Sequence, residues 1–222
     1  MTDHPSPERE AEQASRCDPS AKHGRPPVEI AIGDSNMNPG GIGLLPLLAE
    51  DFRTHGRSLL SPGFWILAVH RFGNWRMSIA TRLLRAPMTA VYRTAYRSSY
   101  ALWGIDLPYN VKVGRRVRLG HHGCMVLGAG EIGDDVVIQH SVTLGLSRRY
   151  DTKVPKIGNR VEIGPGACIV GGIRVGDGSY IGPNTVVNRD VPENSVALGI
   201  PMRLVSEAEL TGAAPGTSKG PK

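Results

Sequence analysis

The chain has 222 residues and a formal net charge of +6, with 40% hydrophobic and 21% charged residues. These values are typical of a globular protein and exclude a fully disordered one. Ten of the twelve aromatic residues precede residue 111, whereas sixteen of the 28 glycines lie between residues 111 and 205. The composition therefore predicts two regions built in different ways.

The basic excess is local, because residues 51–100 contain eight arginines and a single acidic residue, Asp51. Such a segment can meet a membrane surface, a nucleic acid or another polyanion, but a solvated helical face is the interpretation we favour. We therefore expect no nucleic-acid partner and do not favour a membrane contact. Three cysteines without CxxC spacing argue against a disulfide framework or a zinc site and favour a reducing compartment. Since the sequence shows neither a signal peptide nor an apolar run of membrane-spanning length, we expect a cytoplasmic protein.

Four regions follow one another along the chain. Residues 1–40 are polar, without a sustained period, and are expected to form a disordered tail. Residues 41–104 repeat apolar side chains at three- and four-residue steps, which predicts an α-helical region. A β-helical domain is expected over residues 105–205, followed by a flexible tail over 206–222.

The helical region carries two further signals. Pro62 precedes one apolar run, and Pro87 is expected to break or restart the helical pattern. Tyr92, Tyr96 and Tyr100 recur every four residues, which puts them on one helix face and predicts a packing seam.

From residue 105 onwards the period is six. An aliphatic residue, which we call the anchor, recurs about every six positions. A small or β-branched residue lies four positions after most anchors, and glycine often follows the anchor directly. Each hexad supplies one short strand and one turn, and three hexads close a triangular coil, so the repeat predicts a parallel β-helix and an α+β fold class. A step of thirteen residues, from 144 to 157, predicts a loop projecting from this prism. The predicted anchors are Val113, Leu119, Val126, Ile132, Ile138, Leu144, Ile157, Ile163, Ile169, Val175, Ile181 and Val187.

Ordered motifs make a family resemblance specific. The segments GIDLPY, LGHHG, IQHSVTLG, VPKIGNRVEIGPGACIVGG and ALGIPMRLV resemble the left-handed β-helix acyltransferases of the hexapeptide-repeat superfamily, and most closely the serine O-acetyltransferases of cysteine biosynthesis. The resemblance covers roughly residues 45–205. It implies a left-handed β-helix, acetyl-CoA as co-substrate and transfer of acetyl to a small hydroxyl acceptor, with L-serine the first candidate.

By motif position, the resemblance makes His121 the general base and Asp106 the carboxylate that orients it. The chemistry suits these residue types, because a hydroxyl is a weak nucleophile at neutral pH and imidazole titrates near the working pH. A carboxylate on the second ring nitrogen fixes the tautomer and stabilises the imidazolium. Without the resemblance, His121 would be taken as an exposed corner residue and Asp106 as a turn cap.

Further binding residues follow by position or charge. His122, His140 and Lys153 are secondary candidates for contacts with the acceptor. Lys156 is a phosphate candidate by charge alone, and the other cofactor candidates come from the resemblance. No histidine has metal-ligand spacing, so no metal is expected. The residues expected to bind acetyl-CoA are Gly145, Lys156, Ala167, Gly171, Pro201 and Arg203.

Two departures from the family pattern bear on the acceptor. Gly120 stands where the family has an aspartate before the histidine, and Val154 stands where it has the histidine of an Arg-His-Pro-Lys-Ile loop. One alternative is therefore an O-acetyltransferase for a sugar or exopolysaccharide precursor. The other is a non-catalytic trimeric scaffold whose basic helices bind a membrane or polyanion.

The resemblance also bears on assembly. It implies a homotrimer with active sites between neighbouring prisms, and it leaves open a dimer of trimers. Since the chain printed here ends in GTSKGPK, without the terminal isoleucine typical of the family, a complex with cysteine synthase is not expected.

Overall fold

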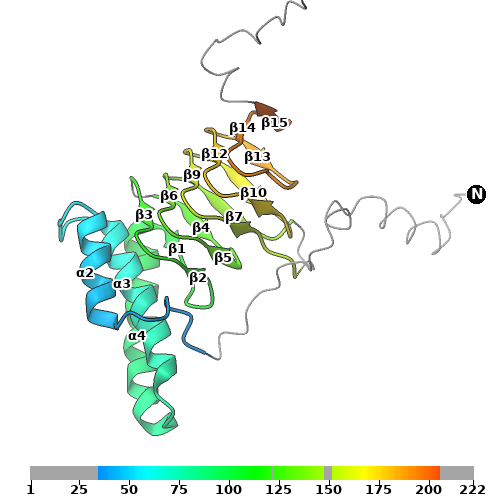
Figure 1. Cartoon of the computed structure of the whole chain (residues 1–222). Coiled ribbons are helices and arrows are strands. Elements are labelled where there is room, and N and C mark those ends of the chain that lie inside the picture. The colour runs from blue at the N-terminus through cyan, green and yellow to red at the C-terminus, as the bar shows by residue number, and fades with distance from the viewer. Residues whose placement is uncertain (1–34, 122, 148–151, 206–222) are drawn as a thin grey trace, which may run out of the picture.

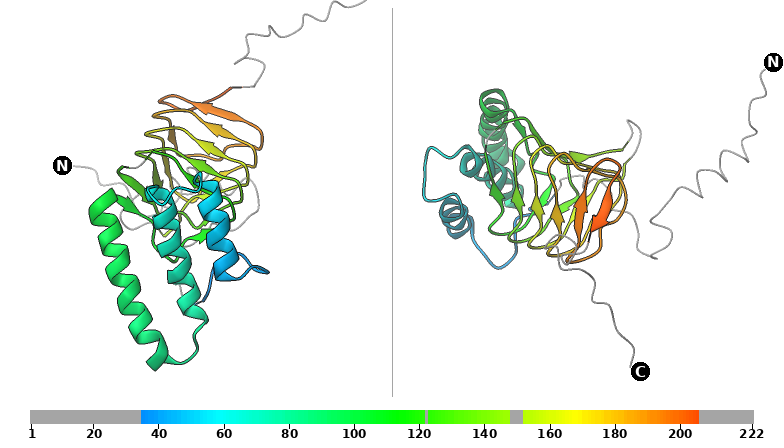
Figure 2. Two further views of the ribbon diagram at one scale, coloured as in Figure 1. Left: turned by 90° about the vertical axis from the view of Figure 1, so that its left-hand side faces the viewer. Right: turned by 90° about the horizontal axis from the view of Figure 1, so that it is seen from above.

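The computed structural model describes residues 35–121, 123–147 and 152–205. Most of the tail predicted over residues 1–40, and the whole of that predicted over 206–222, lie outside the described residues. Helices gather at one end of a prism of short strands (Figures 1 and 2). They are α2 (Leu44–Thr54), α3 (Pro62–Trp75), the 3₁₀ helix η2 (Arg76–Ser78) and α4 (Arg82–Trp103).

Proline affects the helices differently at its two positions. Pro62 is the first residue of α3, where its missing N–H costs no hydrogen bond. Pro87 lies inside α4, so the expected break at this position is wrong. This part of α4 is exposed, so the carbonyl that loses its helical partner can bind water instead.

Up to β13, every third strand stacks on the one a coil earlier, and β14 then stacks on β12 and β15 on β14. The three sheets are ordered β1-β4-β7-β10-β13, β2-β5-β8-β11 and β3-β6-β9-β12-β14-β15. The strand pairings among the described residues are parallel, except that of β14 with β15, and the result is a triangular parallel β-helix (Figure 1). The strands are β1 (Ile105–Asp106), β2 (Lys112–Val113), β3 (Arg118–Leu119), β4 (Met125–Leu127), β5 (Glu131–Ile132), β6 (Val137–Ile138), β7 (Thr143–Gly145), β8 (Lys156–Ile157), β9 (Glu162–Ile163), β10 (Cys168–Val170), β11 (Arg174–Val175), β12 (Tyr180–Ile181), β13 (Val186–Val187), β14 (Val196–Leu198) and β15 (Arg203–Val205).

The hexad anchors form the core of the prism, with one exception. Val126 is 46% exposed, whereas its neighbours Met125 and Leu127 are fully buried. Leu127 pairs with Leu144 on the next coil, so the inward position comes eight residues after Leu119 rather than seven. The anchor predicted at Val126 is therefore wrong, because the turn before β4 holds extra residues that shift the register.

A buried ion pair joins the helices to the first coil. Arg71 of α3 donates from Nε to Asp51 Oδ2 of α2 over 3.0 Å, and neither side chain is exposed to solvent. The same guanidinium donates to the carbonyls of Val113 at 2.7 Å and Gly114 at 2.6 Å. Burial raises the pKa of Asp51, and the charge of Arg71 opposes that shift. One arginine thus ties two helices to β2.

His55, just after α2, forms a second joint. Its Nδ1 lies 2.8 Å from the Asp51 carbonyl, and its Nε2 accepts the Leu119 N–H over 3.2 Å. Gly63 of α3 packs so closely here that a Cβ would lie 2.7 Å from both His55 Nε2 and the Leu119 carbonyl. Only glycine fits at this crossing without displacing its neighbours.

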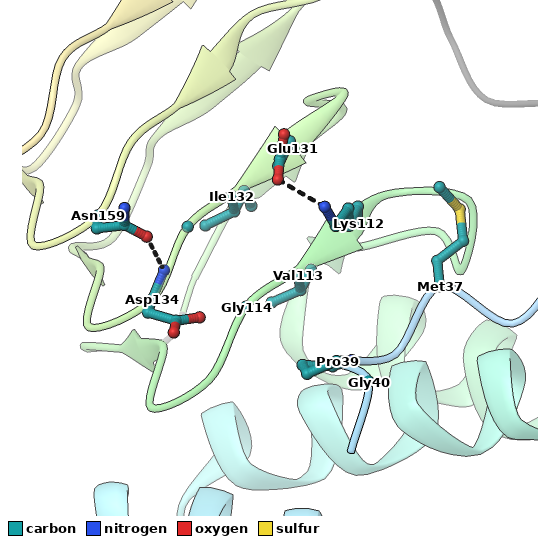
Figure 3. A pocket seen from close by; sticks show the side chains of 11 residues that line it. Met37, Pro39, Gly40, Lys112, Val113, Gly114, Glu131, Ile132, Asp134 and Asn159 are labelled. Carbon is teal, nitrogen blue, oxygen red and sulfur yellow. Dashed lines mark hydrogen bonds and ion pairs between the residues drawn. The ribbon is translucent and has the colours of Figure 1, made fainter. Parts of the chain in front are cut away.

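Part of the segment for which a tail was expected is tied to α3. The Met37 N–H donates to Asn74 Oδ1 over 3.0 Å, and Asn38 Nδ2 donates to the Arg71 carbonyl over 2.9 Å. Met37, Pro39 and Gly40 also line a pocket of about 270 Å³ against β2 and β5 (Figure 3). Its polar groups are paired within the wall, as in the Lys112 to Glu131 ion pair of 2.8 Å.

Candidate active site

His121 lies in the turn that shifts the register. It has a positive φ of 45°, and Gly123 and Cys124 follow with φ of 133° and 45°. The Ser141 N–H of the next coil donates to the Gly123 carbonyl over 3.1 Å, which ties the turn to the coil above. Single residues with positive φ also lie at regular corners of the prism, such as Asp135 and Ser141, but this turn holds three of them. The turn leaves the His121 side chain exposed at a corner of the prism.

His140 faces His121 from the following coil. The ring centroids are 5.9 Å apart and the planes are nearly perpendicular, at 88°. His140 follows β6, and its carbonyl accepts the Gly166 N–H over 3.0 Å. Two sequence-predicted residues thus meet at one corner. The third, His122, lies outside the described residues.

Asp106 is held by a helix. It lies in β1, beside Val126 of β4, and its Oδ1 accepts a hydrogen bond from the hydroxyl of Tyr96 in α4. Burial raises the pKa of Tyr96, and the hydrogen bond to the carboxylate raises it further. Among the described residues, Asp106 and His121 form no hydrogen bond with each other. The tyrosine periodicity placed Tyr96 on a packing face but gave no sign that it binds Asp106.

An apolar groove of about 330 Å³ runs along the same sheet as Asp106. It begins at Val126, in the strand that follows the His121 turn, and includes Gly145 and the buried Val154. A Cβ at Gly145 would meet nothing within 4 Å, and the Gly145 carbonyl accepts the Gly171 N–H over 3.0 Å. The two glycines predicted to bind acetyl-CoA are therefore neighbours at this edge. The remaining lining residues are Pro108, Asn110, Val111, Gly128, Ala129, Leu144 and Leu146.

Ala167 lies inside the prism. Its side chain is fully buried in the core, and its carbonyl accepts the Thr143 N–H over 2.9 Å. The Ala167 N–H points to the Gly164 carbonyl at 3.3 Å. The side chain is therefore not exposed to a ligand outside the prism, and a contact of Ala167 with acetyl-CoA stays a prediction.

The predicted cationic residues lie on different parts of the prism. Lys156 forms an ion pair with Glu131 on the sheet of β2, β5 and β8. Lys153 packs its side chain beside Gly172, where an added Cβ would lie 2.7 Å from Lys153 Cβ. Arg203 is exposed on β15, beyond the cis peptide bond that precedes Pro201. The described chain thus does not gather these residues into one cluster.

Gly120 and Val154 are the two positions that depart from the family pattern, and neutral side chains occupy the space at both. A Cβ at Gly120 would lie 2.8 Å from Gln139 Oε1, so the glutamine amide takes the space beside the His121 turn. Val154 is 2% exposed and lines the groove. Sequence reasoning missed Gln139, whose role depends on contact between successive coils.

Among the residues that the structure describes, no group of three or more His, Cys, Asp or Glu side chains is arranged so that it could hold a metal ion.

Comparisons with known proteins agree with this architecture. A family model described as bacterial transferase hexapeptide (six repeats) matches residues 155–189. The serine acetyltransferase of Mycobacterium tuberculosis is 35% identical over 156 residues, which cover 69% of this chain and 65% of that protein. The serine acetyltransferase of Helicobacter pylori strain J99 is 35% identical over 151 residues, covering 67% of this chain and 84% of the relative. This chain thus spans just under two thirds of the first relative and most of the second.

Solved structures give the same result. The soybean serine acetyltransferase apoenzyme aligns with a TM-score of 0.62 at 30% identity, covering 73% of this chain and 69% of that one. A serine acetyltransferase in complex with CoA aligns with a TM-score of 0.59 at 27% identity, with the same coverage. The parallel β-helix predicted from the hexads is confirmed, and so is the left-handed form that the family resemblance implies. By its repeats, its fold and its similarity to these relatives, the chain belongs to the serine acetyltransferase family of hexapeptide-repeat transferases.

Proposed function

We propose that this protein transfers an acetyl group from acetyl-CoA to the hydroxyl of a small acceptor, with L-serine the first to test. The observation that carries the proposal is the His121 turn, which interrupts the regular coil and presents an imidazole at the prism corner opposite His140. An apolar groove starts in the next strand. The names of the relatives support the same reaction class.

In the proposed reaction, His121 removes the proton from the acceptor hydroxyl while the hydroxyl oxygen attacks the acetyl carbonyl carbon. The tetrahedral intermediate collapses by breaking the carbon–sulfur bond, and the imidazolium returns its proton to the sulfur, so free CoA thiol and an acetyl ester result. Asp106 stabilises the imidazolium. Tyr96 occupies one carboxylate oxygen, Oδ1, which leaves the second oxygen to accept an imidazole N–H.

The groove at Gly145 is proposed to hold the pantetheine arm. Its wall is mostly apolar, and Gly145 leaves the backbone open to a ligand. Gly171 lies beside it. For the CoA phosphates, Arg203 and Lys156 remain the proposed cations, with Pro201 shaping the loop before Arg203. His140 and Lys153 are proposed to contact the acceptor.

A second acceptor class follows from the filled positions. Gln139 takes the space beside Gly120, and Val154 presents an apolar surface to the groove. These neutral groups suit a sugar hydroxyl better than a charged amino acid. A sugar or exopolysaccharide precursor is therefore the alternative acceptor.

We also propose a homotrimer working in the cytoplasm. The cysteines Cys124 and Cys168 are free thiols, which suits a reducing compartment. A groove open along one sheet suits a site completed by a neighbouring prism. Sedimentation equilibrium at several concentrations tests the assembly, and a monomer at all of them would contradict it.

The reaction is tested by release of free thiol from acetyl-CoA with serine, homoserine, nucleotide sugars and glycans as acceptors. Turnover with serine alone supports the first acceptor, and turnover with sugars alone supports the second. No thiol release above hydrolysis with any acceptor, from protein that binds CoA in calorimetric titration, would contradict the transferase. Absence of CoA binding would favour the scaffold.

The base is tested by His121→Gln. We expect kcat to fall by about 10²- to 10⁴-fold, because a positioned general base contributes that much. Cys124→Ser is the matched control, since it lies in the same turn with the same positive φ and is expected to retain activity. Near-normal kcat in His121→Gln would show that another group removes the proton.

A further inference from the structure

The helical end of the molecule carries a strong excess of positive charge. Residues 52–105 contain eight arginines and no aspartate, glutamate or lysine. Two of the arginines are internal: Arg71 pairs with Asp51, and Arg76 lies between the rings of Tyr92 and Tyr109 at 4.7 and 4.6 Å from their centroids. The other six are at or near the surface, and they are Arg53, Arg57, Arg82, Arg85, Arg93 and Arg97.

Large apolar side chains are exposed at one end of this region. We call residues 75–86 the hairpin tip, comprising the end of α3, η2 and the first turn of α4. Within it Leu83 is 83% exposed, Leu84 is 63% exposed and Trp75 is 37% exposed. The start of α4 projects well away from the strands (Figures 1 and 2). These leucines therefore cover no core of their own chain.

Arginines stand beside the exposed leucines. Arg82 and Arg85 share the first turn of α4 with Leu83 and Leu84. That turn contains no acidic residue, and no side chain caps its N–H groups, so the helix end adds positive partial charge. The hairpin tip thus combines exposed apolar surface with positive charge alone.

Exposed leucines next to arginines favour an anionic phospholipid surface over a second copy of this chain. A second copy docking tip to tip would bring Arg82 and Arg85 against the same residues, and like charges at close range oppose association. An anionic phospholipid surface accepts both features, since its phosphates pair with arginine and its acyl boundary takes leucine. No helix among the described residues is long and apolar enough to cross a bilayer, so the contact is made at the surface.

We propose that the hairpin tip docks on an anionic phospholipid surface, with Leu83 and Leu84 entering the headgroup layer and Arg82 and Arg85 binding lipid phosphates. The proposal stands apart from the acetyl transfer, because the tip includes no residue assigned to catalysis. It places the helical end of the molecule, rather than the prism, against the membrane.

The test is co-sedimentation of the full chain with vesicles of phosphatidylcholine alone or with one quarter phosphatidylglycerol. We expect binding to the anionic vesicles only, weakening as salt rises from 0.1 to 0.5 M, because surface charges are screened at high ionic strength. Equal binding to both vesicle types, or no binding to either, would overturn the proposal.

Two double variants locate the contact. Arg82→Gln with Arg85→Gln is expected to weaken vesicle binding by about thirtyfold, at about 1 kcal/mol for each arginine. Leu83→Ser with Leu84→Ser is expected to weaken it by about tenfold or more. Because these leucines are exposed, the folded structure should persist, which circular dichroism checks.

Matched controls lie on the prism. Arg118→Gln with Arg160→Gln removes the same charge from exposed positions, and Ile200→Ser with Leu204→Ser removes exposed apolar groups at the far end. Both are expected to bind vesicles within twofold of the parent protein. If the arginine control loses binding equally, net charge and not the tip is responsible.

The other partners give different results. If the leucine variant changes the sedimentation of the protein in solution while vesicle binding is unaffected, the tip is a contact between copies. If duplex DNA removes the protein from vesicles and the leucine variant binds normally, the arginines serve a polyanion. Either result would overturn membrane docking.

Discussion

At the scale of single residues, Gly63 shows how closely the helices approach the prism. A methyl group there would lie 2.7 Å from His55 Nε2 and from the Leu119 carbonyl. We expect Gly63→Ala to lower the free energy of unfolding by about 1–3 kcal/mol, the usual cost of overpacking. Urea denaturation measures the effect. In Gly40→Ala, where an added Cβ meets nothing within 4 Å, stability should be unchanged, and equal loss in both variants would contradict the packing argument.

His70 gives a residue-level prediction on pH. Burial lowers its pKa to about 3 from an ordinary 6.5, while Nε2 lies 2.9 Å from the Val111 carbonyl. Since the unfolded chain binds the proton more readily, His70 stabilises the fold above pH 6.5, and that stability is lost as pH falls towards 3. We expect the free energy of unfolding to fall between pH 7 and 5 by about 2 kcal/mol more in the parent protein than in His70→Gln. Parallel pH profiles would contradict this.

Single-residue properties also explain which site predictions could be made. His121 was found because a motif and a chemical requirement coincide at one position. For Ala167 the motif gave a position but did not show that the side chain lies inside the prism. Tyr96 and Gln139 make contacts between different elements, and a local sequence pattern does not show such contacts.

At the scale of elements, α4 joins the helical end to the candidate active site. Tyr96 stacks on Tyr92, with ring centroids 5.7 Å apart, and donates its hydroxyl hydrogen bond to Asp106 in β1. Helix α4 therefore holds the carboxylate of Asp106, the first acidic residue of the prism, in position. Tyr100, one turn further along α4, is 56% exposed.

The hydrogen bond between Tyr96 and Asp106 is expected to affect kcat but not the KM for acetyl-CoA. Tyr96→Phe is expected to lower kcat by about tenfold, because a hydrogen bond to a charged group contributes about 1.5–3 kcal/mol, part of which reaches the transition state. The KM for acetyl-CoA should stay unchanged, since the groove lies apart from Tyr96. Steady-state thiol release measures both values. Tyr100→Phe should behave as the parent protein, and an equal fall in kcat there would show a general effect of the helix.

The same scale shows where the pattern misled. Val126 is aliphatic and close to the right spacing, so the repeat predicts an anchor there. The turn before β4 holds extra residues and has positive φ at His121, Gly123 and Cys124, so Met125 and Leu127 point inward and Val126 points outward. A repeat of six shows that this turn is irregular but does not show how many residues it holds.

At the scale of the whole molecule, the fold was predictable because the repeat is redundant. Many hexads specify the same coil, so one wrong anchor leaves the architecture unchanged. The joint between helices and prism was not predictable. It depends on Asp51, Arg71 and His55, which meet carbonyls and amides far along the chain.

The structure at the two ends of the prism determines whether another molecule can add its strands there. A stack of parallel coils offers a fresh row of backbone groups at each end, onto which another molecule could add. At one end the helices cover the first coil. At the other, β15 runs antiparallel to β14, and buried Met202 closes the core. Together these two lids give the solenoid a defined length and prevent it from elongating into a fibre.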